Sequence, residues 1–233
     1  MPNHVENIVT FEGNEKDIKE LMNCLIIEGE PSTEGFCPMP TELRGTTSPS
    51  KVKDQVLINK YGHDNWYDWA LENWGTKWGF YSGSVISDSS VYFQTAWATP
   101  YKAMVSLSEK FPSVTIKVQY ADEDFGHNVG EYTLLSGDEI DINIPEGGSA
   151  EAIKMALEIR EEYEWYLLDM WDDYEDDEIR DMLENDFYIN VLKVAVDNKI
   201  FYEEISNIVK EKMIQLAVDV EAYRFAQKIK DTM

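Results

Sequence analysis

The sequence predicts an α+β fold in which a mixed domain with an antiparallel sheet is followed by an all-helical region. Up to about residue 148, segments in which apolar and polar residues alternate are interspersed with segments in which apolar residues recur every three or four positions. From Ser149 onward only the helical spacing continues. The pair Gly147 and Gly148 separates the two patterns. We therefore expect two domains, at 1–148 and 149–233.

The mixed domain begins with a strand, a helix and a long connection. Residues 3–11 alternate, which predicts a strand, and the apolar spacing of residues 14–28 predicts a helix capped by Asn14. Residues 29–50 are rich in Pro, Gly, Ser and Thr, as is typical of a loop. Residues 51–73 then favour one further helix.

The second part of this domain repeats the alternation of strand and helix. The strings GFYSGSVISDSS and VYFQTAWAT are aromatic and β-branched, which indicates an antiparallel pair. Pro100 suits the first turn of a helix that Pro112 ends, and SVTIKVQYADED reads as a strand. The resulting order β, α, β, β, α, β is the split βαβ arrangement of ferredoxin-like folds. EYTLLSGDEIDINIPEGG follows as a hairpin and a linker.

The remaining sequence predicts three helices. Ser149 can cap the first, whose apolar residues recur at helical spacing from Ala156 to Tyr174. The second is expected at 178–197 and the third at about 200–230.

Composition limits the partners. The 45 acidic and 20 basic residues give a formal net charge of −25, which disfavours direct nucleic-acid binding and contact with an anionic membrane, and favours a basic partner. No apolar run is long enough to span a bilayer and the first residues do not resemble a secretion signal, so we expect a cytoplasmic protein. Cys24 and Cys37 have no metal-site spacing, and no motif calls for a cofactor.

Several strings resemble a known family. They are PNHVEN, FCPMPTEL, ENWGTKW, FQTAWATP, LSEKFP and YADEDFGHNVGEY. In this order, residues 1 to about 135 resemble the YubB-like ferredoxin-like domain family of phage, plasmid and mobile-element proteins. The resemblance implies a ferredoxin-like fold and an accessory protein that acts in a bacterial host cell, and it leaves the helical region outside the match. It implies no general activity.

Two tryptophan-rich strings, ENWGTKW and FQTAWATP, form the first candidate site. Aromatic faces beside one amine could hold a flat, anionic ligand such as a nucleotide. The alternative is that the indoles seal the sheet against its helices, and on both interpretations we expect Trp74, Trp78 and Trp97 to be buried near one another. The candidate ligand-binding residues are Trp74, Thr76, Lys77, Trp78, Thr95 and Trp97.

The string YADEDFGHN forms the second candidate site. Asp122, Glu123, Asp124 and His127 could bind a divalent cation or arrange a carboxylate pair for a hydrolase. Adjacent residues of a strand point to opposite faces, so the alternative is a solvated turn. No other catalytic motif is present, and the sequence favours a binding protein over an enzyme.

Residues 161–186 contain thirteen acidic residues and one basic residue, Arg180. A helix with its apolar stripe buried would present a negative strip that imitates the phosphates of a nucleic acid. The alternative is a solvated face. The candidate partner-binding residues are Glu158, Glu161, Glu162, Asp169, Asp172, Asp173, Asp176 and Asp177.

These observations rank three functions. The first is a non-enzymatic accessory protein that binds and inhibits a host protein through its acidic surface. The second is a module that binds a small nucleotide-like ligand at the tryptophans, and the third is a metal-dependent hydrolase.

Overall fold

The computed structural model describes residues 2–160, 174–200, 207–220 and 222–233. The chain divides into two compact units. Residues 1–124 and 128–144 form the first, and residues 125–127 and 145–233 form the second. The short loop 125–127 therefore belongs to the helical unit although it lies between two strands of the other.

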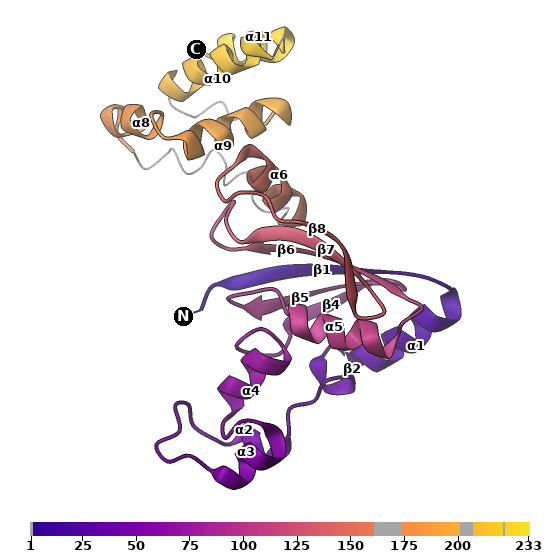
Figure 1. The fold of residues 1–233 in the computed structure, drawn as a ribbon. Coiled ribbons are helices and arrows are strands. Elements are labelled where there is room, and N and C mark those ends of the chain that lie inside the picture. Colours follow the sequence, from indigo (N-terminus) through magenta and orange to yellow (C-terminus); the bar gives the residue numbers. More distant parts are fainter. Residues whose placement is uncertain (1, 161–173, 201–206, 221) are drawn as a thin grey trace. The chain divides into compact units, whose positions relative to one another are not determined.

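The first unit is built on one antiparallel sheet of six strands, in the order β4-β5-β1-β6-β7-β8 (Figure 1). The sheet carries two helices, α1 (Glu15–Leu25) and α5 (Tyr101–Lys110). Without β7 and β8, the strands and helices follow the split βαβ topology, which confirms the predicted fold class. The strands are β1 (His4–Glu12), β4 (Tyr81–Ser87), β5 (Ser90–Ala96), β6 (Thr115–Asp122), β7 (Val129–Leu135) and β8 (Asp138–Asn143).

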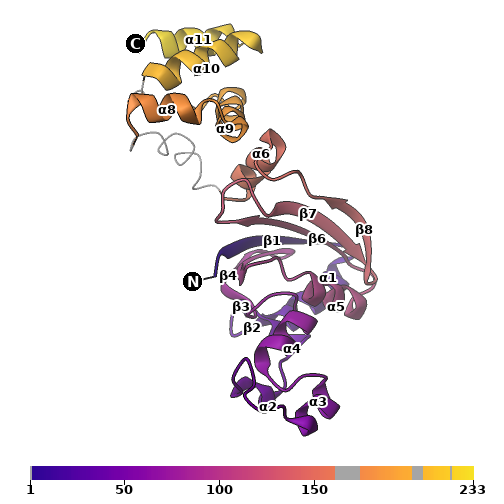
Figure 2. The ribbon, with the colours of Figure 1, turned by 60° about the vertical axis from the view of Figure 1, so that its left-hand side comes forward.

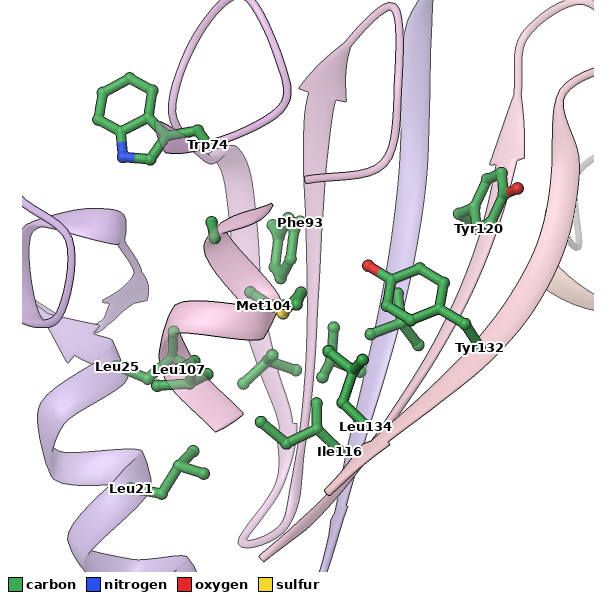
Figure 3. Packing of buried hydrophobic residues seen from close by; sticks show 14 of the residues in the cluster. Leu21, Leu25, Trp74, Phe93, Met104, Leu107, Ile116, Tyr120, Tyr132 and Leu134 are labelled. Atoms are coloured by element: carbon green, nitrogen blue, oxygen red, sulfur yellow. The ribbon is translucent and has the colours of Figure 1, made fainter. Parts of the chain in front are cut away.

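The core of this unit lies between the sheet and its two helices, which cover the same face (Figures 1 and 2). In the central strand, Val9 lies opposite Val91 of β5 and Val118 of β6, so three apolar side chains meet across the sheet. Met104 and Leu107 of α5 pack onto this layer (Figure 3). Asn14 accepts a hydrogen bond from the backbone N–H of Asp17 and starts α1, as the sequence predicts.

Residues 26–80 form a long insert between α1 and β4. The single helix expected at 51–73 is two helices, because α3 ends at Gly62 with φ 80° and Asn65 caps α4. The indole N–H of Trp74 donates to the carbonyl of Cys37 at 2.9 Å, and the Trp74 ring packs edge-on against Trp69. These contacts tie the loop around Cys37 to α4. The insert contains β2 (Ile26–Ile27), β3 (Glu30–Pro31), η1 (Thr33–Gly35), α2 (Thr41–Arg44), α3 (Gln55–Tyr61) and α4 (Trp66–Asn73).

The carboxylate of Asp64 organises the turn between α3 and α4. It accepts hydrogen bonds from the Lys53 ammonium and the Asp54 backbone N–H, both at 3.2 Å, and from the Asn65 side chain at 3.0 Å. Burial by itself would raise the pKa of Asp64, but these bonds and one from Ser50 outweigh it and lower the pKa to about 2. The turn is therefore held together by an ionised carboxylate.

The second unit is helical. The first helix is expected to run from Ser149 to about Tyr174, but α6 ends at Ile159. Residues 161–173 lie outside the described residues. The helix expected at 178–197 is two helices separated by the N-cap Asn185, and two helices separated near Ala222 occupy the described part of 200–230. The helices of the described residues are α6 (Ala150–Ile159), α8 (Asp176–Met182), α9 (Asp186–Asp197), α10 (Asn207–Asp219) and α11 (Tyr223–Lys230).

The loop 125–127 packs within this helical unit. Gly126 has φ 74°, and a Cβ atom there would lie 2.9 Å from the Ile153 side chain, so only glycine fits. Its carbonyl accepts the backbone N–H of Gly148 at 2.9 Å, and the His127 ring stacks on Phe187. Within the described ranges no helix is long and apolar enough to cross a membrane.

Candidate ligand-binding site

The ammonium group of Lys77 lies between two indole rings. Its Nζ is 4.8 Å from the ring centroid of Trp78 and 4.6 Å from that of Trp97. Both distances fall within the range of cation–π attraction. The two indoles are 38% and 44% exposed, so the expectation that they are buried is wrong. We call Trp78 and Trp97, with Lys77 between them, the indole pair.

Further rings extend the indole pair on both sides. Tyr67 meets Trp97 edge-on at 6.4 Å, and Tyr81 meets Trp78 edge-on at 6.1 Å. The Tyr81 hydroxyl lies 2.8 Å from Nδ1 of His4. Burial, with Glu123 and Tyr92 nearby, raises the pKa of Tyr81 to about 12, so its phenol keeps its proton at neutral pH. The site therefore offers aromatic rings, one cation and one phenol.

Trp97 reaches the surface because its backbone is left-handed, with φ 73°. Bulky residues rarely adopt this conformation, which costs about 1–2 kcal/mol. Its N–H donates to the carbonyl of Asn3 at 3.0 Å, and its own carbonyl accepts from the Asn128 side chain at 3.1 Å. The residue is thus held from both sides by segments that lie far apart in the sequence.

Asp122 supports both of these contacts. Its Oδ1 accepts from the Asn3 side chain at 3.0 Å, and its Oδ2 accepts from the Asn128 side chain at 2.7 Å. Oδ1 also accepts the backbone N–H of Asp124 at 2.9 Å. This carboxylate, which the sequence suggested for metal binding or proton transfer, therefore orients the two asparagines that hold Trp97.

The other members of that acidic string do not converge with Asp122 on a cation. Glu123 and Asp124 are exposed, and His127 belongs to the helical unit, where it stacks on Phe187. No group of three or more potential metal ligands occurs within the residues that the structure describes.

The two candidate threonines are buried and lie close in sequence to the indole pair. Thr76 is buried and its hydroxyl donates to the carbonyl of Ala96 at 2.5 Å, which joins the loop that carries Lys77 to the end of β5. Thr95 is buried, donates to the carbonyl of Ala98 at 2.8 Å and accepts from the Asn7 side chain at 2.9 Å. Trp74 is buried in the insert. Of the six predicted residues, Trp78 and Trp97 are exposed and Lys77 is half-buried between them.

Only part of the predicted acidic surface is described. Glu158 and Asp177 are exposed, Asp176 is the first residue of α8, and Glu161, Glu162, Asp169, Asp172 and Asp173 lie outside the described residues. Three acidic residues at the start of α8 have local partners. Glu175 and Glu178 form a capping box, and Asp177 accepts from Arg180 at 2.8 Å. Carboxylates at a helix N-terminus are favourable, which accounts for part of the acidic run.

Sequence reasoning missed His4, Tyr81, Asn3 and Asn128. Three of them belong to the strings PNHVEN and YADEDFGHNVGEY, whose asparagines had no assigned role. Asn3 and Asn128 could have been found from their positions directly before a strand, where an asparagine side chain commonly bonds to backbone groups.

Residues 73–167 match the model of a family described as a ferredoxin-like domain in Api92-like protein. The match begins at the end of α4 and extends beyond residue 135, so its bounds differ from those of the resemblance drawn from the sequence. No curated protein and no solved structure matches the chain. The region that carries the indole pair and the strands from β4 to β8 is therefore similar to a ferredoxin-like family.

Proposed function

We propose that this protein is a non-enzymatic binding module whose indole pair holds a small, planar, anionic ligand of the nucleotide type. The observation that carries the proposal is the position of the Lys77 ammonium between the rings of two exposed tryptophans. A base can stack on an exposed tryptophan, and a phosphate can pair with the ammonium.

The ion pairs of the molecule favour this role for Lys77. Lys53, Lys60, Lys102 and Lys117 each contact a carboxylate, whereas Lys77 forms no ion pair among the described residues. The two rings attract its charge without neutralising it. An incoming anion would therefore meet an ammonium that no carboxylate of the described ranges already neutralises.

The charge of the protein limits the size of the ligand. A net charge of −25 repels a long polyanion, because nucleic-acid binding depends on many lysine and arginine contacts to phosphates. A single nucleotide needs only one such contact. The proposal is therefore for a mononucleotide or a compound of similar size and charge.

The test is calorimetric titration with a mononucleotide, its nucleoside and inorganic phosphate. Trp97→Ala is expected to weaken nucleotide and nucleoside binding by about tenfold or more, because base stacking contributes about 1–3 kcal/mol. Lys77→Met should weaken only the nucleotide, to the affinity of the nucleoside.

Two matched variants control for the loss of an exposed ring and of a charge. Tyr223→Ala removes a 60% exposed ring from α11, and Lys102→Met removes a lysine that pairs with Glu72. Both should bind as the parent protein does. If no ligand binds, or if Trp97→Ala and Lys77→Met bind unchanged, the proposed function is wrong.

A second candidate is the binding of a basic host protein through the acidic surface, in the phage or mobile-element setting that the sequence resemblance suggests. The observation that favours it is the exposure of the Asp177 and Glu158 side chains within a chain of net charge −25. Such a surface would accelerate encounter with a positively charged partner, and salt would weaken it.

Charge reversal tests this candidate. Changing Asp172, Asp173, Asp176 and Asp177 to Lys should abolish capture of a basic partner from a bacterial lysate at low salt and leave the fold intact. Circular dichroism should show at most a small loss of helix, because Asp176 and Asp177 stand at the favourable N-terminus of α8. Capture of the same partner with unchanged affinity would show that the acidic residues are only a solvated face and do not bind the partner.

A further inference from the structure

The strand β8 leaves one edge of the sheet open. The strand order ends at β8, and within the described residues no strand pairs with its outer edge. An unpaired edge presents a row of backbone donors and acceptors that can pair with another strand.

Three isoleucines mark this open edge. Ile140, Ile142 and Ile144 are 55%, 49% and 59% exposed. Ile142 of β8 lies opposite Tyr132 of β7, which is buried. The face of the sheet that is covered at β7 is therefore exposed at β8. A run of half-exposed isoleucines along an edge strand is a feature that proteins ordinarily avoid, because it promotes association.

The opposite edge of the sheet is protected. β4 pairs with β5 through two register shifts, and Ser82 within it has φ 50°. Gly83 of β4 also lies against the ring of Pro31, so closely that a Cβ atom on Gly83 would be 2.9 Å from the proline Cδ. Irregularity and a covering segment are common protections of an edge strand. β8 has one register shift, and residues 141–143 pair regularly.

The charge of β8 indicates what can pair with it. The segment 138–144, DEIDINI, has three acidic residues and no basic residue. A second copy would add three further carboxylates to this edge and no basic residue to pair with any of them, which is less favourable than a basic strand. A strand that alternates apolar residues with lysine or arginine would cover the isoleucines on one face. On the other face it would pair with Asp138 and Asp141, which lie opposite Leu135 and Thr133.

We infer that β8 is a docking edge for an extended segment of a partner protein that alternates apolar and basic residues. The segment adds a seventh strand to the sheet, its backbone supplies the hydrogen bonds, and its apolar side chains cover Ile142 and Ile144. This surface is separate from the indole pair, and the inference does not depend on the ligand proposed there.

Fluorescence anisotropy with short labelled peptides tests the inference. A peptide that alternates valine with lysine should bind about tenfold more tightly than one that alternates valine with glutamate, because the cross-strand charge pairs with Asp138 and Asp141 change sign. A peptide with the valines and lysines grouped in two blocks has the same charge but cannot form an amphipathic strand, and it should also bind about tenfold more weakly. Hydrogen exchange should show new protection at 138–144 with the alternating peptide.

Matched variants separate the edge from general attraction to an acidic protein. Ile142→Lys should weaken the alternating valine–lysine peptide about tenfold or more, whereas Ile86→Lys, the same change at a 54% exposed isoleucine of β4, should have little effect. Equal binding of the block peptide, or equal loss in the two variants, would overturn the inference. So would a dimer of the free protein whose exchange protection falls on β8, because a second copy would then occupy the edge.

Discussion

At the scale of single residues, Trp97 combines a left-handed backbone with an indole that is 44% exposed. A glycine would adopt the same φ without strain, and a smaller side chain would expose less apolar surface. The tryptophan therefore costs stability at this position, as residues at functional sites often do. Asn3, Asn128 and Asp122 are the groups that offset this cost.

Substitutions at Trp97 can separate the backbone strain from the role of the ring. Trp97→Gly is expected to be about 1 kcal/mol more stable than Trp97→Ala, because alanine retains the strained φ and glycine does not. Both variants should lose ligand binding equally. Urea unfolding of the two variants measures the difference, and an alanine variant that is as stable as the glycine variant would exclude strain at this position.

Asp122 supports a second prediction. Asp122→Ala leaves the side-chain amides of Asn3 and Asn128 without this acceptor, which should lower the free energy of unfolding by about 1–3 kcal/mol. Asp88→Ala, in the exposed turn between β4 and β5, is the control and should change little. EDTA should leave the thermal unfolding temperature of the parent protein unchanged. A decrease with EDTA would restore the metal hypothesis for Asp122.

At the scale of elements, apolar periodicity predicted the strands and helices of the ferredoxin-like unit, because each buries one face against the same core. It could not locate the breaks at Gly62, Asn185 and Ala222, since apolar residues continue at helical spacing across them. Nor could it show that Trp78 and Trp97 face outward. Loops have no periodicity, and the direction of Trp97 depends on Asn3 and Asn128, which are distant in sequence.

The turn at Asp64 predicts a dependence of stability on pH. The pKa of Asp64 is depressed from 3.8 to about 2, so its contribution to stability is complete above about pH 4 and disappears as the pH falls toward 2. Urea unfolding between about pH 5 and pH 2 should show this loss, and Asp64→Asn should be less stable at the upper end of this range and less dependent on pH. Asp88→Asn should behave as the parent protein. An unchanged pH dependence in Asp64→Asn would mean that other carboxylates dominate.

At the scale of the whole molecule, the helical unit includes residues 125–127, which lie in sequence between two strands of the other unit. Phe125 in this loop is buried. The sheet and its helices nevertheless have a core of their own, which includes Tyr132 and Leu134 of β7. A unit with a separate core can fold without its neighbour.

A fragment that ends at Gly148 is accordingly expected to fold alone. Circular dichroism should show mixed helix and strand, and urea should unfold the fragment in one cooperative transition. A fragment that ends at Asp122 retains the split βαβ elements but loses Tyr132 and Leu134 from the core, so it should be less stable by a few kcal/mol. An unfolded fragment 1–148 would show that the helical unit is needed for folding.

The central position of β1 also affects how the chain folds during its synthesis. Val9 pairs with Val91 and Val118, which are 82 and 109 residues later (91 − 9 and 118 − 9). The ribosome therefore releases β1 long before either of its neighbours exists, and the strand stays unpaired while the insert is made. Pairings this far apart slow folding and leave an apolar strand unprotected in the meantime. The nascent chain is thus expected to depend on chaperones until β6 has emerged.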